Sequence, residues 1–428
     1  GAKIKYVLET HFHADFVSGH LDLSKATGAA IVYGPTAQPN FEAHIAQDGE
    51  QLKLGNISIE VLHTPGHTME SSTFLLRDEN GKEHSIFTGD TLFIGDVGRP
   101  DLAVKSDLSR EDLASHLYDS LRNKIMPLPN DVIIYPGHGA GSACGKNMSD
   151  ETVDTLGHQK EVNYALRPDM KREDFIKAVT DGLVAPPQYF PKNAVLNKQG
   201  YESIDEVYSK SLKALSAEDF ALEMKTHGAL VIDTRKKEEF KEAHIPGSWF
   251  IGLEDNFAPW VGALVENLNT PLLLIVDEGK EEEAVTRLAR VGYDNALGYL
   301  KGGMKSWTDN SFKTESLIDV SADDFANMKL AEGEWILDVR KQSEFDSQHI
   351  INDRVINAPL DYFDNEVEGL DVNKTYYVHC AGGYRSVIAS SILKHKGFKK
   401  VYNLDGGFKA LKETKLSVSE YHEQVTML

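Results

Sequence analysis

THFHADFVSGH, residues 10–20, is the stretch that decides the fold of the first part of this 428-residue chain. In an extended segment, residues i and i+2 face the same way, so His11 and His13 can converge on one ion with Asp15 beside them. Three later motifs carry further candidates: His67 in HTPGHT, Asp90 in FTGDTLF and His138 in YPGHG. A Pro-Gly bend or the end of a strand presents each of these side chains. The order of the motifs predicts a metal site at strand ends.

Composition narrows the function classes. The chain is 41% hydrophobic and 26% charged, as in soluble globular proteins, and its length predicts two or three domains. The net charge of −21 argues against a nucleic-acid or anionic-membrane surface, because phosphate binding needs clustered Lys and Arg. No apolar run approaches the roughly 20 residues that span a bilayer. The two cysteines, Cys144 and Cys380, form no disulfide framework, which favours a cytoplasmic location.

The first segment, residues 1–204, alternates apolar runs with glycine-rich turns. The expected strands lie at 57–62, 84–90 and 132–139, and the expected helices at 108–125 and 172–183. The Pro-rich stretch 185–200 is aperiodic and is expected to form an extended arm or linker.

The rest of the chain contains an internal repeat. VIDTRKKEEFKEAHIPGSW (231–249) matches ILDVRKQSEFDSQHIINDRV (336–355), and Asp233 pairs with Asp338 at an offset of 338 − 233 = 105. Each copy reads as a strand, an Asp-x-Arg turn and alternating helices and strands, followed by Gly-Gly and a helix. This pattern predicts two α/β domains, at 205–312 and 313–428.

TYYVHCAGGYRS (375–386) predicts a strand, a tight loop and a helix, with Cys380 opening the loop. Such a loop turns its N–H groups inward, and this anion nest together with Arg385 stabilises a thiolate. Phosphatases use a longer Cys-x5-Arg loop, whereas this Cys-x4-Arg spacing favours sulfur transfer. The expected catalytic pair is Cys380 and Arg385, and the expected substrate-binding residues are Ala381, Gly382, Gly383, Tyr384 and Ser386.

The earlier copy lacks this chemistry. Its matching strand is followed by DEGKEEEAV (277–285), which contains no cysteine and no arginine and whose acidic side chains repel anions. The first copy is therefore predicted to be catalytically silent, with a spacer or docking role.

THFHAD, HTPGHT, FTGDTLF and YPGHG together resemble the metallo-β-lactamase superfamily. TGDTLFIGDVGRPDL and YPGHGAGSACGKN resemble its persulfide dioxygenase branch, which is close to glyoxalase II, and in particular the fusions with rhodanese domains. This resemblance implies a multi-domain α/β chain: an αββα fold followed by two rhodanese-like domains with parallel sheets, the first inactive. It also implies further strands ahead of residue 1, and a homo-oligomer.

Phe16 stands where the binuclear form of the first motif has a histidine, and phenylalanine cannot bind a metal. His11, His67 and Asp90 can still supply the two-histidine, one-carboxylate face of non-haem Fe(II) oxygenases, and the resemblance implies these ligands and one Fe(II) per chain. His13, Asp15 and His138 would then orient ligands or substrate.

The same resemblance implies that Arg99 binds the carboxylate of a thiol carrier, although it could instead only tie down a loop. Cys144 follows His138 closely and could relay sulfur or be inert.

The resulting expectation is an enzyme of sulfide detoxification. It oxidises small persulfides, carried by glutathione, coenzyme A or similar thiols, with O2 to sulfite. It also forms or uses thiosulfate through a Cys380 persulfide. The alternative is a two-zinc, glyoxalase II-like thioester hydrolase fused to a sulfurtransferase. A sulfur sensor or carrier without turnover is a third option.

Overall fold

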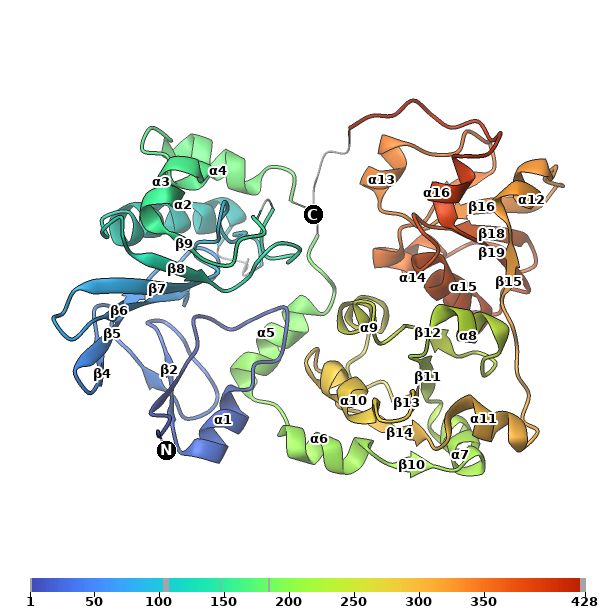
Figure 1. Ribbon diagram of the computed structural model, residues 1–428, viewed down its shortest axis with the longest axis horizontal. Helices are drawn as coiled ribbons and strands as arrows, with labels where there is room; N and C mark the ends of the chain where they lie inside the picture. The colour runs from blue at the N-terminus through green and yellow to red at the C-terminus, as the bar shows by residue number, and fades with distance from the viewer. Residues whose placement is uncertain (1, 103–107, 147, 184, 424–428) are drawn as a thin grey trace. The chain divides into compact units, whose positions relative to one another are not determined.

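The computed structural model describes residues 2–102, 108–146, 148–183 and 185–423. The chain separates into two compact units, with the division between Ser203 and Ile204 (Figure 1). The first unit contains two β-sheets, and the second contains two parallel sheets, one for each copy of the repeat.

The sheets of the first unit differ in size and in strand direction. The smaller has three parallel strands, β1 (Tyr6–Leu8), β2 (Ala30–Tyr33) and β3 (His44–Ile45). The larger runs in the order β4 (Gln51–Leu54), β5 (Ile57–His63), β6 (Ser72–Arg77), β7 (Glu83–Gly89), β8 (Ile133–Pro136) and β9 (Asp154–Thr155). Its neighbours are antiparallel except β7 and β8, so the residues that follow these two strands, Asp90 and His138, reach the same edge.

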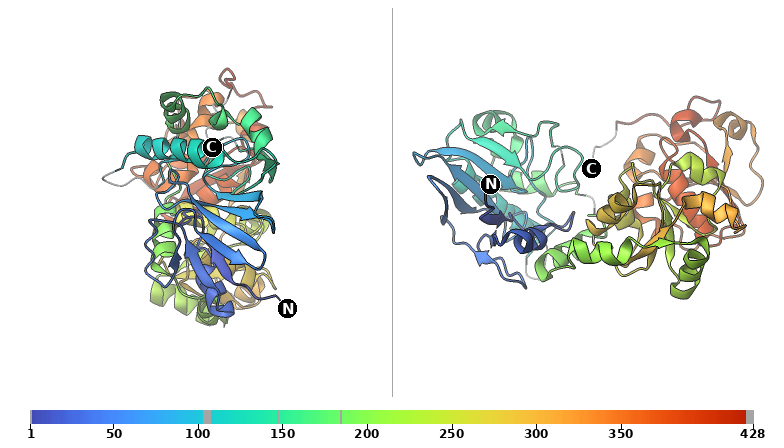
Figure 2. Two further views of the ribbon diagram at one scale, coloured as in Figure 1. Left: turned by 90° about the vertical axis from the view of Figure 1, so that its left-hand side faces the viewer. Right: turned by 60° about the horizontal axis from the view of Figure 1, so that its bottom comes forward.

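Three apolar layers hold the first unit together. Val32, Val61 and Phe74 fill the space between the sheets. Leu117 of α2 (Arg110–Ser120) and Phe175 of α4 (Arg172–Thr180) pack on the other face of the larger sheet, as the left view of Figure 2 shows for α2. The smaller sheet is covered by α1 (His20–Thr27). Burying each such side chain contributes about 1.5–3 kcal/mol. The αββα prediction is confirmed.

The helices of the first unit test the sequence predictions. Ser109 caps α2 and forms a capping box with Asp112, and the helix continues as a π-helical turn, Leu121–Ile125. Two shorter segments are α3 (Leu156–Val162) and a 3-10 turn at Tyr164–Leu166. The prediction of an arm at 185–200 was wrong, because α5 covers Phe190–Gln199. Pro191 lies in its first turn, where a missing N–H breaks no helical hydrogen bond.

In the second unit, both copies have the same strand order. α6 (Ile204–Ser211) leads into a sheet ordered β10 (Ala214–Leu215), β14 (Ala296–Leu300), β13 (Leu272–Ile275), β11 (Leu230–Asp233) and β12 (Trp249–Phe250). The second sheet is ordered β15 (Ile318–Val320), β19 (Lys400–Leu404), β18 (Thr375–His379), β16 (Glu334–Asp338) and β17 (Val355–Asn357). All pairings are parallel, as the repeat predicted.

Helices connect these strands in both copies. The first has α7 (Ala217–His227), α8 (Lys237–Glu242), α9 (Phe257–Leu264), α10 (Glu281–Ala289) and α11 (Gly303–Asp309). The second has α12 (Ala322–Asn327), α13 (Gln342–Ser347), a 3-10 turn (Leu360–Tyr362), α14 (Phe363–Glu366), α15 (Arg385–His395) and α16 (Gly407–Leu411). Among the described residues, no helix combines the length and the apolar character that crossing a bilayer requires.

Candidate metal centre and cysteine loop

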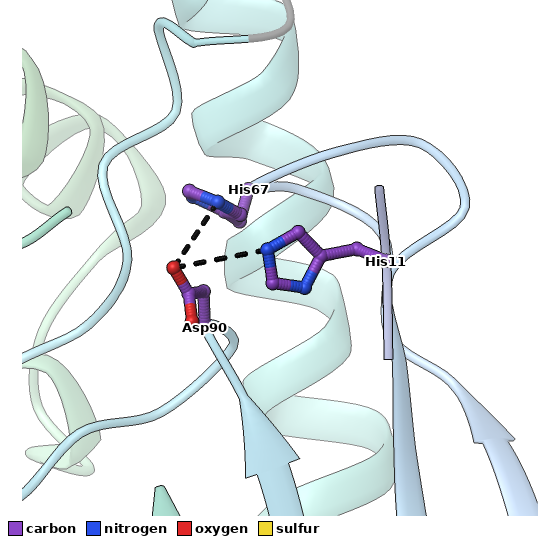
Figure 3. Close-up of side chains that lie close together, drawn as sticks. All are labelled: His11, His67 and Asp90. Atoms are coloured by element: carbon purple, nitrogen blue, oxygen red, sulfur yellow. Dashed lines mark ion pairs between the residues drawn. The ribbon is translucent and has the colours of Figure 1, made fainter. Parts of the chain in front are cut away.

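His11, His67 and Asp90 converge on one buried point (Figure 3). His11 follows β1, His67 lies on the bend between β5 and β6, and Asp90 follows β7. The Oδ2 atom of Asp90 is 3.3 Å from His67 Nε2 and 3.9 Å from His11 Nε2. None of the three is more than 2% exposed. The three predicted ligands therefore lie close enough to hold one ion.

The imidazoles are oriented for binding. His11 Nδ1 lies 2.9 Å from the Thr10 hydroxyl, and His67 Nδ1 donates to the Arg99 carbonyl at 2.9 Å. Each ring therefore turns Nε2 toward Asp90, the arrangement by which proteins fix metal-binding histidines. Both carboxylate oxygens of Asp90 are buried and lack an ordinary hydrogen bond within the described residues. Buried anionic oxygens of this kind fit a cation.

Electrostatics agree with this geometry. Burial lowers the pKa of His11 well below its usual range, so the ring is neutral, the form that binds metals. Burial alone would raise the pKa of Asp90, but the neighbouring imidazoles of His11 and His67 bring it below its ordinary value. The site therefore presents a neutral imidazole at His11 and an ionised carboxylate at Asp90.

A second cluster adjoins the first and consists of His13, Asp15 and His138. His138 Nε2 lies 3.4 Å from Asp15 Oδ2 and 3.4 Å from Asp90 Oδ1. His13 Nδ1 lies 3.9 Å from Asp15 Oδ1, and the Phe16 ring stacks on His13 with centroids 4.5 Å apart. These groups can orient the first cluster or hold a second ion, so their orienting role remains a prediction.

One residue that supports this loop was missed in the sequence. Asn197 lies on α5, inside the stretch expected to be a linker. Its Nδ2 group donates to the carbonyls of His13 and Phe16, each at 2.7 Å, and its Oδ1 atom accepts from the Ser18 N–H at 2.9 Å. A buried amide therefore fixes the backbone of the first histidine motif. A helical pattern around Pro191 could have placed Asn197 on a helix, although it could not have shown which backbone groups this residue contacts.

Close backbone approach also shapes the site. A Cβ atom on Gly137 would lie 2.5 Å from Asp90 Oδ1, so only glycine leaves room for this carboxylate. The bend that carries His67 is fixed from α2, because the Ser120 hydroxyl donates to the Pro65 carbonyl at 2.7 Å. The glycine and proline of the two Pro-Gly-His motifs thus position neighbouring ligands.

Arg99 and Cys144 lie in buried loops. The Arg99 guanidinium makes two hydrogen bonds with Asp101, at 2.6 and 2.7 Å, and donates to the Ala143 carbonyl at 3.2 Å. These contacts tie down loops, the alternative that the sequence left open, and carrier binding by Arg99 remains a prediction. The Cys144 sulfur lies with Asp90 and His138 in one cluster of potential ligands. Burial raises the pKa of this thiol well above its ordinary value, and its sulfur-relay role also remains a prediction.

Cys380 follows β18 at the carboxyl edge of the second parallel sheet. The Gly383 N–H donates to Cys380 Sγ at 3.1 Å, and the Ser386 hydroxyl lies 3.7 Å from the same sulfur. Arg385 begins α15 and pairs with both carboxylate oxygens of Glu344, at 2.6 and 2.8 Å. The loop therefore directs an amide and a hydroxyl at the sulfur, while its arginine is held by a glutamate.

The Gly-Gly turn of the repeat supports this loop. The N–H groups of Phe408 and Lys409 donate to the carbonyls of Cys380 and Ala381, at 2.7 and 3.0 Å. A Cβ atom on Gly407 would lie 2.5 Å from the Cys380 carbonyl oxygen, so a larger residue would push the loop away. The repeated glycines had no assigned purpose in the sequence, and this contact supplies one.

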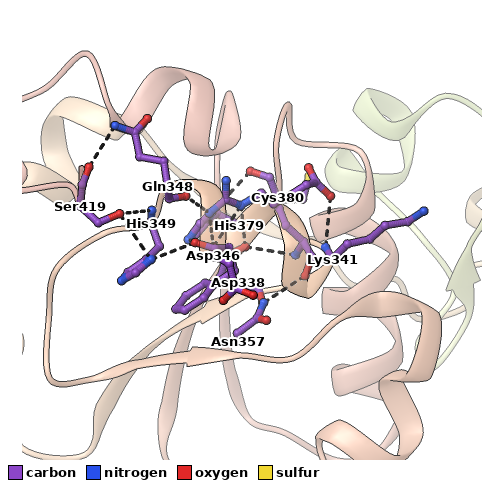
Figure 4. A network of polar contacts seen from close by, with 12 residues as sticks. Asp338, Lys341, Asp346, Gln348, His349, Asn357, His379, Cys380 and Ser419 are labelled. Carbon is purple, nitrogen blue, oxygen red and sulfur yellow. Dashed lines mark hydrogen bonds and ion pairs between the residues drawn. The ribbon is translucent and has the colours of Figure 1, made fainter. Parts of the chain in front are cut away.

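The Asp-x-Arg turn forms a buried network beneath the loop (Figure 4). Arg340 makes paired hydrogen bonds to Asp338, the Asn357 amide donates to the Asp338 carbonyl at 2.9 Å, and His379 Nε2 lies 3.7 Å from Asp338 Oδ2. The network fixes the sheet edge that precedes Cys380. Asp233 and Arg235 form the same pair in the first copy, residues 205–312, so that copy keeps the scaffold. Because this copy is predicted to be catalytically inactive, it is called the silent copy below.

The silent copy contacts the cysteine loop directly. The Tyr384 hydroxyl accepts from the Gly252 N–H at 3.1 Å and donates to the Asp255 carbonyl at 3.0 Å. The Phe250 N–H donates to the Ser391 hydroxyl at 3.0 Å. Tyr384 was predicted to bind substrate, and its hydroxyl is engaged by the neighbouring copy. Gly382 has no described atom within 4 Å of the position of a Cβ, so the loop is open at this point.

Comparison with known proteins agrees with this division of the chain. Residues 1–138 match the metallo-beta-lactamase superfamily, and residues 216–310 and 321–414 each match the rhodanese-like domain. A probable hydroxyacylglutathione hydrolase of Schizosaccharomyces pombe is 40% identical over 135 residues, which are 32% of this chain and 48% of that protein. The mitochondrial persulfide dioxygenase of Homo sapiens is 32% identical over 190 residues, 44% of this chain and 66% of that protein.

A solved structure extends the comparison. The crystal structure of a metallo-beta-lactamase from Staphylococcus aureus is 31% identical, with a TM-score of 0.59, and the match covers 70% of this chain and 84% of that one. The chain spans between about half and two thirds of the length of the two curated relatives above. The chain belongs to the metallo-beta-lactamase superfamily and carries two rhodanese-like domains after its metal-binding domain.

Proposed function

We propose that this protein is a non-haem iron persulfide dioxygenase coupled to a sulfurtransferase. The observation that carries the proposal is the buried face of His11, His67 and Asp90, with both imidazoles fixed through Nδ1. Two histidines and one carboxylate with open positions favour ferrous iron. Similarity to persulfide dioxygenases supports the same reaction.

The reaction at this site is RSSH + O2 + H2O → RSH + H2SO3. Ferrous iron bound here would supply the O2 chemistry, as cofactors do in oxygenases generally. The protein's own residues would hold the ion and orient it, and burial of all three would exclude competing water. The carrier RSH is proposed to be glutathione, coenzyme A or a similar small thiol, and the working protein a homo-oligomer.

Sulfur transfer is assigned to Cys380. Its thiolate attacks the outer sulfur of a persulfide or of thiosulfate, the S–S bond breaks, and RS⁻ or sulfite leaves with the electron pair. The Gly383 N–H stabilises the charge on sulfur. In the reverse direction, the Cys380 persulfide gives its outer sulfur to sulfite and forms thiosulfate. The two reactions together remove sulfide in the form of small oxidised anions.

Metal analysis with oxygen uptake tests the dioxygenase. Purified protein loaded anaerobically with ferrous iron should hold about one iron per chain and consume O2 with one or more of a panel of persulfides. The matched pair His67→Ala and His63→Ala sharpens the test, because His63 is the last residue of β5, just before this bend, and hydrogen-bonds the Met69 carbonyl. Only the first variant should lose iron. Full oxygen uptake by an iron-free His67→Ala protein would refute the assignment.

A two-metal thioester hydrolase is the second candidate. It is favoured by the cluster of His13, Asp15 and His138 beside the first site, and by similarity to hydroxyacylglutathione hydrolases. Two zinc ions per chain and cleavage of an S-lactoyl thioester would select this candidate. The variant His13→Ala separates the two, because it should halve the metal content of a binuclear enzyme and leave that of a single-iron enzyme nearly unchanged.

A further inference from the structure

An ammonium group from the silent copy lies at the cysteine loop of the active copy. Lys237 begins α8, and its Nζ atom lies 3.8 Å from the position that a Cβ atom on Gly383 would occupy. The amide of the same Gly383 donates to Cys380 Sγ at 3.1 Å. A positive charge of the catalytically silent domain therefore stands beside the loop that holds the reactive sulfur.

The active copy's own cation is already neutralised. Arg385 is joined to Glu344 by two short hydrogen bonds, and both side chains are largely shielded from solvent. Burial opposes both charges, but the pairing keeps the pKa of Glu344 below and that of Arg385 above their ordinary values. The pair is thus ionised, with no net charge, and it offers an incoming anion little attraction.

Lys237 is less firmly paired. Its ion pair with Glu238 is long, 3.9 Å, and the Glu238 side chain is 65% exposed, which makes the pair weak. The active copy has Gln342 at the corresponding position, since 342 − 237 = 105, so the helix of the repeat does not itself require a lysine here. Hydrogen bonds from Tyr384 to the Gly252–Asp255 segment hold the two copies together and so fix the place of this ammonium group.

We propose that Lys237 binds the sulfonate group of a sulfur oxyanion at the Cys380 loop. This inference rests on the proposed sulfur transfer. When thiosulfate is the donor, its outer sulfur is attacked by Cys380 while the SO3 group, which leaves as sulfite with the S–S electron pair, stays near the ammonium. When sulfite is the acceptor, the same contact holds it for attack on the outer sulfur of the Cys380 persulfide. The silent domain thereby supplies part of the anion site.

Two variants of full-length protein separate charge from structure. Lys237→Gln removes the charge, and Lys237→Arg keeps it. Lys236→Gln is the matched control, because Lys236 is the exposed neighbour that precedes α8. The first readout is thiosulfate:cyanide sulfurtransferase activity. We expect Lys237→Gln to raise the KM for thiosulfate roughly five- to tenfold and to reduce its salt dependence, with kcat changed less. Lys237→Arg and Lys236→Gln should stay within about twofold of the parent protein.

The second readout needs no turnover. Iodoacetate and iodoacetamide both alkylate Cys380 with loss of iodide, but only iodoacetate is an anion. Mass spectrometry of the Cys380 peptide gives the ratio of the two rates, which Lys237→Gln should lower at least threefold. An unchanged ratio, or an equal loss of both rates, overturns the role of Lys237. If the parent protein moves no sulfur from thiosulfate, the proposed sulfur transfer fails, and the alkylation ratio still tests the lysine.

Discussion

Removal of the Asn197 amide should release the first histidine motif. In Asn197→Ala, the Ser18 N–H and the carbonyls of His13 and Phe16 lose their partner. A buried polar group left unsatisfied costs about 1–3 kcal/mol. His13 and Phe16 are only partly buried, so water can reach their carbonyls in part. We therefore expect each of the three groups to cost about 1 kcal/mol, so that Asn197→Ala lowers the free energy of unfolding by about 3 kcal/mol.

The assay is urea denaturation of the first unit, together with iron content after ferrous loading and gel filtration. Iron occupancy should fall with stability, because His11 and His13 belong to the released segment. Asn193→Ala is the matched control: Asn193 is equally buried, lies one turn earlier on α5, and its amide has no hydrogen-bond partner within the described residues. If both variants lose the same stability and the same iron content, the hydrogen bonds of Asn197 do not hold the first histidine motif, and the prediction is wrong.

Three further predictions concern the second unit. Cys380→Ser should keep oxygen uptake and abolish sulfur transfer, and loss of both activities would contradict the assignment of one reaction to each unit. Tyr384→Phe should slow sulfur transfer several-fold without affecting oxygen uptake, because it removes two hydrogen bonds to the silent copy, worth about 1 kcal/mol each. An unchanged rate of sulfur transfer would show that these hydrogen bonds do not support the cysteine loop. Burial lowers the pKa of His244 to about 4, from an ordinary value of 6.5. As the pH falls, the unfolded chain therefore takes up a proton on His244 before the folded chain does. The free energy of unfolding should be highest above pH 6.5 and fall by up to about 3 kcal/mol as the pH approaches 4. The control is His349→Asn, which loses the equivalent ring stack on Phe345. In urea denaturation, the free energy of unfolding should decrease less between pH 7 and pH 4.5 for His244→Asn than for this control.

Spacing within the motifs made much of the metal centre predictable. His11 follows a strand of the smaller sheet, whereas His67 and Asp90 follow strands of the larger one, and the ends of these strands bring the three side chains together. Asn197 could not be found in the same way. It acts through the backbone carbonyls of residues far away in the chain, and no local pattern encodes that contact. The prolines around it also favoured a linker, although Pro191 is compatible with the first turn of a helix.

The repeat made the second unit predictable in a different way. Two copies at a constant offset share strand order, the Asp-x-Arg pair and the glycine turn, so each copy confirms the other's elements. Contacts between the two copies could not be predicted from the repeat, because the residues that make these contacts need not occur in both copies. Tyr384 and Lys237 belong to this group, and their partners became visible only in three dimensions.

The hydroxyl of Tyr384 has a consequence for how this chain can be dissected. A fragment that begins after the silent copy would leave Tyr384 and Ser391 without the backbone partners they have in Gly252, Asp255 and Phe250. The domains of a fusion protein are often treated as independent, but here the last domain has a surface that fits the domain before it. The smallest unit of this sequence that keeps the complete sulfur-transfer site is therefore the pair of copies. A recombined or engineered protein that keeps only the second copy would lack the contacts that support its cysteine loop.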